Sequence, residues 1–318
     1  MAAGPDEYVC GSCSATFKRN RFGYFQIMRE IVADAGTSQD YAAGQHRFSS
    51  NAVKFLDPLL RQEPCRTVLD VGCGVGATIT ALARLGYEAY GVDLPEQSQH
   101  WAAVKNDRER LFAASALQLP FADNSFDFVY SLGVIEHIGT VIGHCTLRDD
   151  CVVLRRQYAG EILRVTRPGG RILIACPNKT FPVDLQHGSD DAVRKANPLR
   201  SFISARTGIN IHKTWGRYHL VSYAELKDLF VPRNGPAGRE LTAIPLRNYF
   251  EFARLKQGIL RPLGGVAEYW VNNMPAPARA TFLNPYVMAQ IRKEPAATTE
   301  SAAQAAKLSD KQVSFTRS

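Results

Sequence analysis

The chain has 318 residues, of which 45% are hydrophobic and 21% are charged, values that are ordinary for a globular protein. No apolar run approaches the roughly 20 residues of a membrane-spanning helix, and residues 1–7 lack the basic and apolar regions of a secretory signal. We therefore expect a cytoplasmic protein. The net charge of +8 favours anionic partners in general, but it does not choose among phosphates, nucleic acid and a membrane surface.

The first 50 residues have a mixed pattern, which we interpret as an N-terminal helical or cap segment (1–50). Apolar residues recur at helical spacing between Phe22 and Asp34 and predict a helix there. Cys10 and Cys13 form a Cys-x-x-Cys pair that is typical of half a zinc ribbon. A structural zinc ion needs four ligands and the sequence has no second such pair, so we expect no bound metal.

Short β-rich runs alternate with helical stretches from residue 66 onward. Strands are predicted at 66–71, 88–92, 110–114, 126–131 and 171–175, and helices at 76–85, 97–109 and 152–165. Strands that alternate with helices indicate a doubly wound α/β fold, in which a mostly parallel sheet carries helices on both faces.

The alternation is interrupted twice in the second half of the chain. Loop-rich and aromatic-rich insertions are expected at about 179–221 and 248–280, within a main domain that covers residues 51–293. Between and after the insertions, the pattern predicts a helix at 222–230 and strands at 240–246 and 286–291. The tail from 294 to 318 is rich in Ala, Thr, Ser and Gln without apolar periodicity, so we expect it to be disordered.

The strongest local signal is the sequence Val-Leu-Asp-Val-Gly-Cys-Gly-Val-Gly at residues 68–76, at the first strand-to-helix turn. Glycines at 72, 74 and 76 let the backbone turn sharply and approach a ligand without interference from Cβ atoms. The free amide groups of the following helix can bind a polar ligand. The turn could serve any nucleotide-like ligand in a doubly wound fold, or be a tight turn without a ligand.

Two carboxylates flank this turn. Asp70 lies inside the end of the first strand, where a charge is costly unless it is paired, and an ammonium group is a suitable partner. Asp93 ends the second strand about 20 residues later, where a carboxylate can accept both hydroxyls of a ribose. The sequence Leu-Pro-Phe-Ala-Asp-Asn-Ser-Phe-Asp at residues 119–127 then leads into the fourth strand, which Glu136 and His137 follow.

In this order, Asp-x-Gly-x-Gly-x-Gly, Gly-Val-Asp, Leu-Pro-Phe-x-Asp-x-Ser-Phe-Asp and Glu-His resemble the motifs of class I S-adenosylmethionine (SAM)-dependent methyltransferases. The resemblance points to the group that includes quinone-biosynthesis and natural-product enzymes, and it covers residues 66–178 well and the chain to 293 more weakly. It implies a seven-stranded Rossmann-like sheet, SAM as the cofactor, and methyl transfer to a small-molecule acceptor.

The resemblance also assigns roles by position. The methionine portion of SAM would be held by Asp70, Gly72, Cys73 and Gly74, and Ser131 and Gly133 would line its sulfonium side. Asp93 would bind the ribose hydroxyls and Leu94 would pack on the adenine. Ser115 and Ala116 occupy the place beside the adenine where the family usually has an acidic residue and its neighbour. Ser115 departs from that pattern, because a hydroxyl accepts from the adenine amino group more weakly than a carboxylate does.

A general base would assist transfer to a hydroxyl acceptor, and His137 beside Glu136 is the residue best placed for that role. The alternative is that this Glu-His pair only caps the next segment. His187 and His219 lie in the first insertion, where we interpret them as solvent-facing or structural rather than as bases. Aromatic residues crowd both insertions and suit either an apolar acceptor or a small accessory core: Trp215, Tyr218, Tyr249, Phe250, Phe252, Tyr269 and Trp270.

Other functions remain open at this point. The glycine spacing lacks the Gly-x-Gly-x-x-Gly fingerprint of dinucleotide-binding dehydrogenases. The net charge and the basic run 18–21 suggest RNA or other nucleic-acid methylation as an alternative, although no DNA partner is expected. The fourth strand lacks the Asn/Asp-Pro-Pro-aromatic motif of base methylation. A SAM-binding protein without catalytic activity is the third alternative, and the oligomeric state is not predicted.

Overall fold

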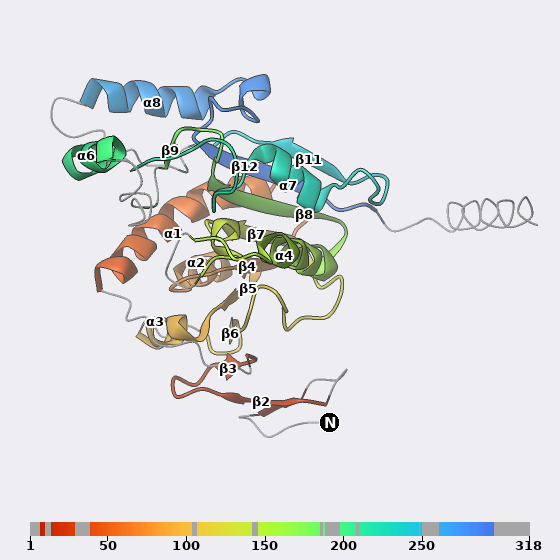
Figure 1. The fold of residues 1–318 in the computed structure, drawn as a ribbon. Helices are drawn as coiled ribbons and strands as arrows, with labels where there is room; N and C mark the ends of the chain where they lie inside the picture. Colours follow the sequence, from red (N-terminus) through yellow and green to blue (C-terminus); the bar gives the residue numbers. More distant parts are fainter. Residues whose placement is uncertain are drawn as a thin grey trace, which may run out of the picture.

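The computed structural model describes residues 7–9, 14–28, 39–103, 107–141, 146–184, 187, 198–207, 210–247, 249 and 261–295. Its centre is a twisted sheet with helices on both faces (Figure 1). The predicted Cys10–Cys13 pair and the tail from residue 296 lie outside the described residues.

Seven strands form the sheet that the sequence predicts. In spatial order they are β6 (Leu111–Ala113), β5 (Glu88–Asp93), β4 (Thr67–Val71), β7 (Phe126–Leu132), β8 (Thr166–Pro177), β12 (Tyr286–Arg292) and β11 (Glu240–Ala243). The first five are parallel to one another, and β12 is antiparallel to both of its neighbours. The prediction of a doubly wound, mostly parallel α/β sheet is thereby confirmed.

The described sheet has ten strands, so the expected number of seven is too low. Three short N-terminal strands extend the edge beyond β6: β1 (Glu7–Val9), β2 (Thr16–Arg19) and β3 (Phe25–Gln26). The helix predicted from Phe22 is therefore wrong up to residue 28, and its remainder lies outside the described residues. The free edge of β6 provides the reason, because Phe25 pairs with Phe112 there and the amide of Ile27 donates to the carbonyl of Ala113.

The helices lie in the expected alternation with the strands. They are α1 (Gln39–Leu60), α2 (Ala77–Arg84), α3 (Ser98–Ala103), α4 (Cys151–Val165), α6 (Pro198–Thr207), α7 (Tyr223–Phe230) and α8 (Arg261–Asn273), with short 3₁₀ turns η1 (Pro95–Gln97), η2 (Ile135–His137) and η4 (Ala276–Ala278). The sequence pattern did not predict α1, which runs across the expected segment boundary at residue 50. None of the described helices is both long and apolar enough to cross a membrane.

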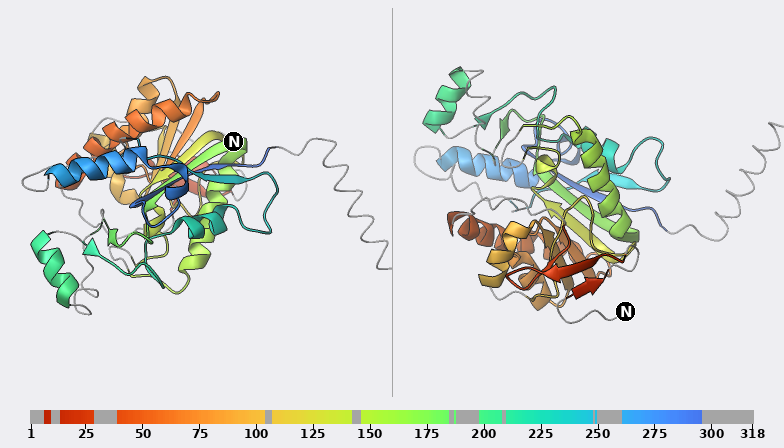
Figure 2. Two further views of the ribbon diagram at one scale, coloured as in Figure 1. Left: turned by 90° about the horizontal axis from the view of Figure 1, so that it is seen from above. Right: turned by 60° about the horizontal axis from the view of Figure 1, so that its bottom comes forward.

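Side chains of successive strand residues alternate between two cores, one on each face of the sheet. Val68 joins the core that α1, α2 and α3 cover, whereas Leu69 joins the core that α4 and α7 cover. Trp101 of α3 is fully buried in the first core and Tyr158 of α4 in the second. Figure 2 shows the two groups of helices on opposite sides of the sheet.

The first insertion begins and ends at the carboxyl end of β8. Asn178 forms a parallel bridge with Val221, so the two ends of the insertion meet there. Within it, β9 (Val183–Asp184) pairs with β10 (Asn210–Ile211) in a separate small sheet. The insertion is therefore fixed above the sheet edge at which parallel strands of this fold bind their ligands.

Candidate functional site

The glycine turn between β4 and α2 has the backbone conformation that only glycine adopts readily. Gly72, Gly74 and Gly76 all have positive φ angles, of 89°, 52° and 72°. The amides of Gly72 and Cys73 both donate to the carbonyl of Val92 at the end of β5, at 2.8 and 3.1 Å. Three residues within five positions have left-handed backbone conformations and all three are glycines. The glycines therefore determine this turn, as the motif predicts.

Asp93, the last residue of β5, lies directly beside the glycine turn. Its Oδ2 accepts from the amide of Gly74 and its Oδ1 from the amide of Leu94, each at 2.7 Å. Burial raises the pKa of Asp93 to about 6, although the two amide hydrogen bonds oppose the rise. Each carboxylate oxygen keeps a lone pair for a further donor, such as a ribose hydroxyl.

Asp70 is buried in the sheet between Gly91 of β5 and Tyr130 of β7. Burial raises the pKa of Asp70 to about 8; a hydrogen bond with Tyr130 opposes the rise, and the nearby charge of Asp93 adds to it. No ion pair to Asp70 is present within the described part of the chain. A buried carboxylate without a cationic partner fits the ammonium group of an amino acid, so the site passes this test for the methionine portion of SAM.

The remaining predicted residues lie at the carboxyl ends of the neighbouring strands. Ser131 of β7 is buried and donates to the carbonyl of Val71, at 2.6 Å. Gly133, with φ 74°, follows β7 and is bonded to β8. Ser115 follows β6, where its Oγ accepts from the amide of Leu117. The structure thus brings four strand ends to one edge, with the apolar side chain of Leu94 exposed there.

A cluster of titratable side chains, which we call the histidine cluster, lies next to the glycine turn: Glu136, His137, Asp184, His187 and His219. A Cβ atom on Gly72 would lie 2.2 Å from Cγ2 of Val134, which precedes η2, so η2 directly contacts the turn. The Nε2 atoms of His137 and His187 are 3.3 Å apart. The Nδ1 of His187 lies 3.0 and 3.2 Å from the carboxylate oxygens of Asp184.

Burial and mutual charge shift the pKa values in this cluster strongly. Burial raises the pKa of Glu136 to about 7 and lowers the pKa of His219 to about 3. Burial would also lower the pKa of His187, but its hydrogen bond and ion pair with Asp184 raise the pKa above the usual value. Titratable groups with strongly shifted pKa values that lie close together beside a ligand site are typical of functional sites.

The structure brings His137, the base predicted from the sequence, together with four side chains that the sequence did not predict as site residues. Of the two alternatives for His219, solvent-facing or structural, its exposure of 1% excludes the first, and Glu136 is fully buried. Asp184 was not singled out at all. The signal that could have found it is an acidic residue and a histidine three positions apart, just after a strand that ends at the ligand edge.

The aromatic residues of the two insertions divide between two settings. Tyr249 is buried, with its ring against those of Phe48, Phe55 and Tyr286, so it belongs to the core. Trp215, Tyr269 and Trp270 are exposed. Phe250 and Phe252 lie outside the described residues. The core interpretation therefore holds for Tyr249, whereas the exposed rings remain available to a ligand.

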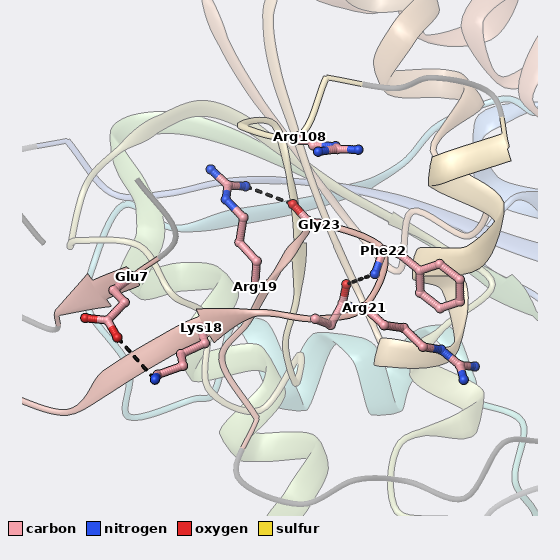
Figure 3. Close-up of a pocket in the computed structure, with 8 residues that line it drawn as sticks. Glu7, Lys18, Arg19, Arg21, Phe22, Gly23 and Arg108 are labelled. Atoms are coloured by element: carbon pink, nitrogen blue, oxygen red, sulfur yellow. Dashed lines mark hydrogen bonds and ion pairs between the residues drawn. The ribbon is translucent and has the colours of Figure 1, made fainter. Parts of the chain in front are cut away.

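A separate pocket of about 520 Å³ lies at the N-terminal edge strands, and β6, β5 and β4 separate these strands from β7 in the sheet (Figures 1 and 3). Its lining includes the basic run that suggested a nucleic-acid partner. Lys18 forms an ion pair with Glu7 at 3.2 Å, and Arg19 forms one with Glu109 and donates to the carbonyl of Gly23. Internal pairing reduces the positive charge that this surface offers to a phosphate backbone.

Comparison with known proteins supports the reading of the motifs. Residues 69–174 match the family described as "Methyltransferase domain". The rice (Oryza sativa subsp. japonica) protein named "Probable tocopherol O-methyltransferase, chloroplastic" is 30% identical over 151 residues, which cover 45% of this chain and 38% of that protein. An O-methyltransferase, resE, of Aspergillus sclerotiorum is 33% identical over 125 residues, covering 35% of this chain and 42% of its own length.

The matches thus span about two fifths of the length of these curated relatives. Among solved structures, the phosphoethanolamine N-methyltransferase 2 of Haemonchus contortus is 18% identical, with a TM-score of 0.44 over 81% of this chain and 58% of that chain. Similarity at this TM-score supports no conclusion about activity. The family match, the parallel sheet and the glycine turn agree with one another: residues 69–174 are similar to methyltransferase domains.

Proposed function

We propose that the chain transfers the methyl group of SAM to an oxygen nucleophile on an apolar or aromatic small molecule. The observation that carries the proposal is the pair of carboxylates at the glycine turn. Asp93 is held by the amides of Gly74 and Leu94, and Asp70 is buried nearby without an ion-pair partner among the described residues. One carboxylate suits the ribose and the other the ammonium group of one ligand, SAM.

SAM is an activated methyl donor, so the protein mainly has to align the acceptor with the methyl carbon and exclude water. In this proposal the backbone turn at Gly72 and the strand ends at Ser131 and Gly133 would line the sulfonium side of SAM. The histidine cluster lies beside this turn, where an acceptor hydroxyl would lose its proton during transfer. His137 stays our prediction for a residue that contacts the acceptor.

Two of the relatives support oxygen as the acceptor atom, because their names describe O-methyltransferases. Exposed aromatic residues of the insertions, Trp215 and Tyr269, supply apolar surface for a ring-containing acceptor. The nucleic-acid alternative is less well supported, because Lys18 and Arg19 are paired within the protein. A cytoplasmic location is part of the same proposal.

The proposal predicts turnover with phenolic acceptors. Purified chain with methyl-labelled SAM should form S-adenosylhomocysteine and an O-methylated product from an apolar phenol. The same compound with its hydroxyl group replaced by hydrogen is the matched control and should stay unlabelled. Label in RNA, with binding that weakens steeply as salt rises, would instead favour the nucleic-acid alternative. SAM binding without turnover on any acceptor class would favour a non-catalytic protein.

A further inference from the structure

We propose that Glu136, His137 and His187 form a binding site for a divalent transition-metal ion, with zinc as the probe that fits their ligand atoms best. Glu136 and His137 belong to η2, and His187 comes from the insertion that follows β8. Their ligand atoms all lie within 4.8 Å of one another. Two imidazoles and one carboxylate are a ligand set that zinc and its first-row neighbours prefer.

The first supporting observation is the spacing of the two imidazole nitrogens. Ligand atoms bound at about 2.0–2.1 Å to one tetrahedral zinc ion lie roughly 3.3 Å apart. The Nε2 atoms of His137 and His187 are separated by 3.3 Å. Two imidazole nitrogens at this distance either share a proton or direct both lone pairs at a common cation.

The second observation identifies which nitrogen of His187 is free for a metal. Both oxygens of Asp184 are within hydrogen-bond distance of its Nδ1, at 3.0 and 3.2 Å. With the proton on Nδ1, the lone pair of Nε2 points toward His137. A metal-bound histidine typically donates its other N–H to a carboxylate, which fixes the ring and strengthens the ligand. Asp184, whose side chain is completely buried, takes this supporting role.

The third observation is a buried carboxylate that the described protein leaves unsatisfied. Glu136 is 0% exposed, and neither of its carboxylate oxygens has a hydrogen-bond partner within the described residues. Such a group is costly unless a cation or a donor meets it. Arg155, a buried cation in the same region, donates to the carbonyls of Ile138 and His219 instead. One carboxylate oxygen of Glu136 lies within 4.8 Å of a ring nitrogen of each of the two histidines, so an ion between the imidazoles would have this oxygen nearby.

His219 defines the competing arrangement. Its Nε2 lies 3.7 Å from Asp184 Oδ2, and Asp184, His187 and His219 also have ligand atoms close together. In that arrangement Asp184, which is already bonded to Nδ1 of His187, would have to be a ligand instead of the acceptor that orients the ring. We therefore place the ion between His137 and His187, with His219 outside the ligand set, which reverses the sequence-based expectation of no metal.

Three protein ligands leave a fourth position of a tetrahedral ion open. Val134, which precedes η2, contacts Gly72, so the ion would lie in a segment that adjoins the glycine turn. An acceptor oxygen bound to the ion would lose its proton more readily and would be held for methyl transfer. This role rests on the proposed function, whereas metal binding itself does not.

The test is calorimetric titration of the full chain, stripped with a chelator, with Zn²⁺ and Co²⁺ in the absence of SAM. The chain carrying Cys10→Ser and Cys13→Ser serves as background, so that this thiol pair contributes no binding. One ion per chain is expected, with a cobalt spectrum typical of nitrogen and oxygen ligands. His137→Ala, His187→Ala and Glu136→Gln should each weaken binding at least about 100-fold. Asp184→Asn should weaken it about 10- to 100-fold.

His100→Ala, a histidine of α3 outside the cluster, is the matched control and should bind as the background chain does. Thermal unfolding of every variant shows whether a loss reflects the site or the fold. Absence of metal binding by the folded background chain would overturn the proposal by itself, whatever the cluster variants show. Binding that survives Glu136→Gln and His137→Ala but disappears in His219→Ala would overturn it in favour of the competing arrangement.

The same preparations separate this proposal from the proposed function. Metal binding without any binding of SAM would contradict the methyltransferase activity and leave the metal site intact. Binding of SAM and turnover, with no metal bound by the folded chain, would contradict only the metal site. The two failures therefore give different results in experiments that share the same protein.

Discussion

Gly72→Ala is expected to destabilise the protein by about 2–5 kcal/mol and to abolish SAM binding. Two causes add at this position. The φ angle of 89° is strained for alanine, which costs on the order of 1–2 kcal/mol. The added Cβ would also lie 2.2 Å from Cγ2 of Val134 and so displace η2, an overpacking that costs about 1–3 kcal/mol. Urea unfolding and calorimetric titration with SAM measure the two effects.

Two further glycines provide matched controls for this substitution. Gly86 has φ 95°, but a Cβ there meets no atom within 4 Å, so Gly86→Ala isolates the backbone strain. Gly160 lies in α4 with open space around it, so Gly160→Ala should stabilise the helix by up to about 1 kcal/mol. The account of the turn is wrong if Gly72→Ala is no less stable than Gly86→Ala and still binds SAM.

Asp70→Asn is expected to stabilise the ligand-free protein at neutral and alkaline pH and to weaken SAM binding at least about 30-fold. The pKa of Asp70 is raised by burial from its ordinary value of 3.8 to about 8. The protonated, neutral carboxyl is tolerated in the folded protein. Below pH 4 Asp70 therefore does not reduce the free energy of unfolding of the wild-type chain. As the pH rises to about 8, the wild-type chain loses free energy of unfolding, because the buried carboxyl must either ionise or stay protonated at increasing cost. The asparagine variant has no such group and loses nothing from this cause.

Thermal unfolding from pH 5 to pH 8 should therefore show a stability difference between Asp70→Asn and the wild-type chain that grows with pH. Saturating SAM should reverse its sign, because only the wild-type carboxylate can pair with the ammonium group. Asp149→Asn, whose side chain is fully exposed, is the control and should track the wild-type chain throughout. A stability difference that is constant with pH would contradict the assignment of a buried, unpaired carboxylate.

Local and periodic features were the ones that the sequence could predict. The glycine turn depends on residues 70–76 alone, because the φ angles of its glycines are set within the turn. The central strands have long apolar runs, and all five predicted strands of the parallel sheet are present. The predicted helix 97–109 shows the limit, because α3 ends at Ala103 and Asp107 bonds to Glu109 and Arg110 in a turn.

Features that depend on distant partners could not be predicted. β3 is only two residues long and exists because β6 offers an edge to Phe25 and Gln26. The contact between His137 and His187 joins residues 50 positions apart, through an insertion whose path is set by the bridge from Asn178 to Val221. No periodicity in the sequence encodes that path, so the sequence predicts a base role for His137 but only a solvent-facing or structural role for His187 and His219.

The central claim is that the glycine turn and Asp93 bind SAM. Its most direct test is calorimetric titration of the purified chain with SAM, S-adenosylhomocysteine and NAD, beside Asp93→Ala. We predict micromolar binding of the two adenosyl ligands and none of NAD. Both affinities should be lost in the variant, because the two hydroxyls of the ribose lose their acceptor. Absence of adenosyl binding by well-folded protein, or binding of NAD in its place, would contradict the account.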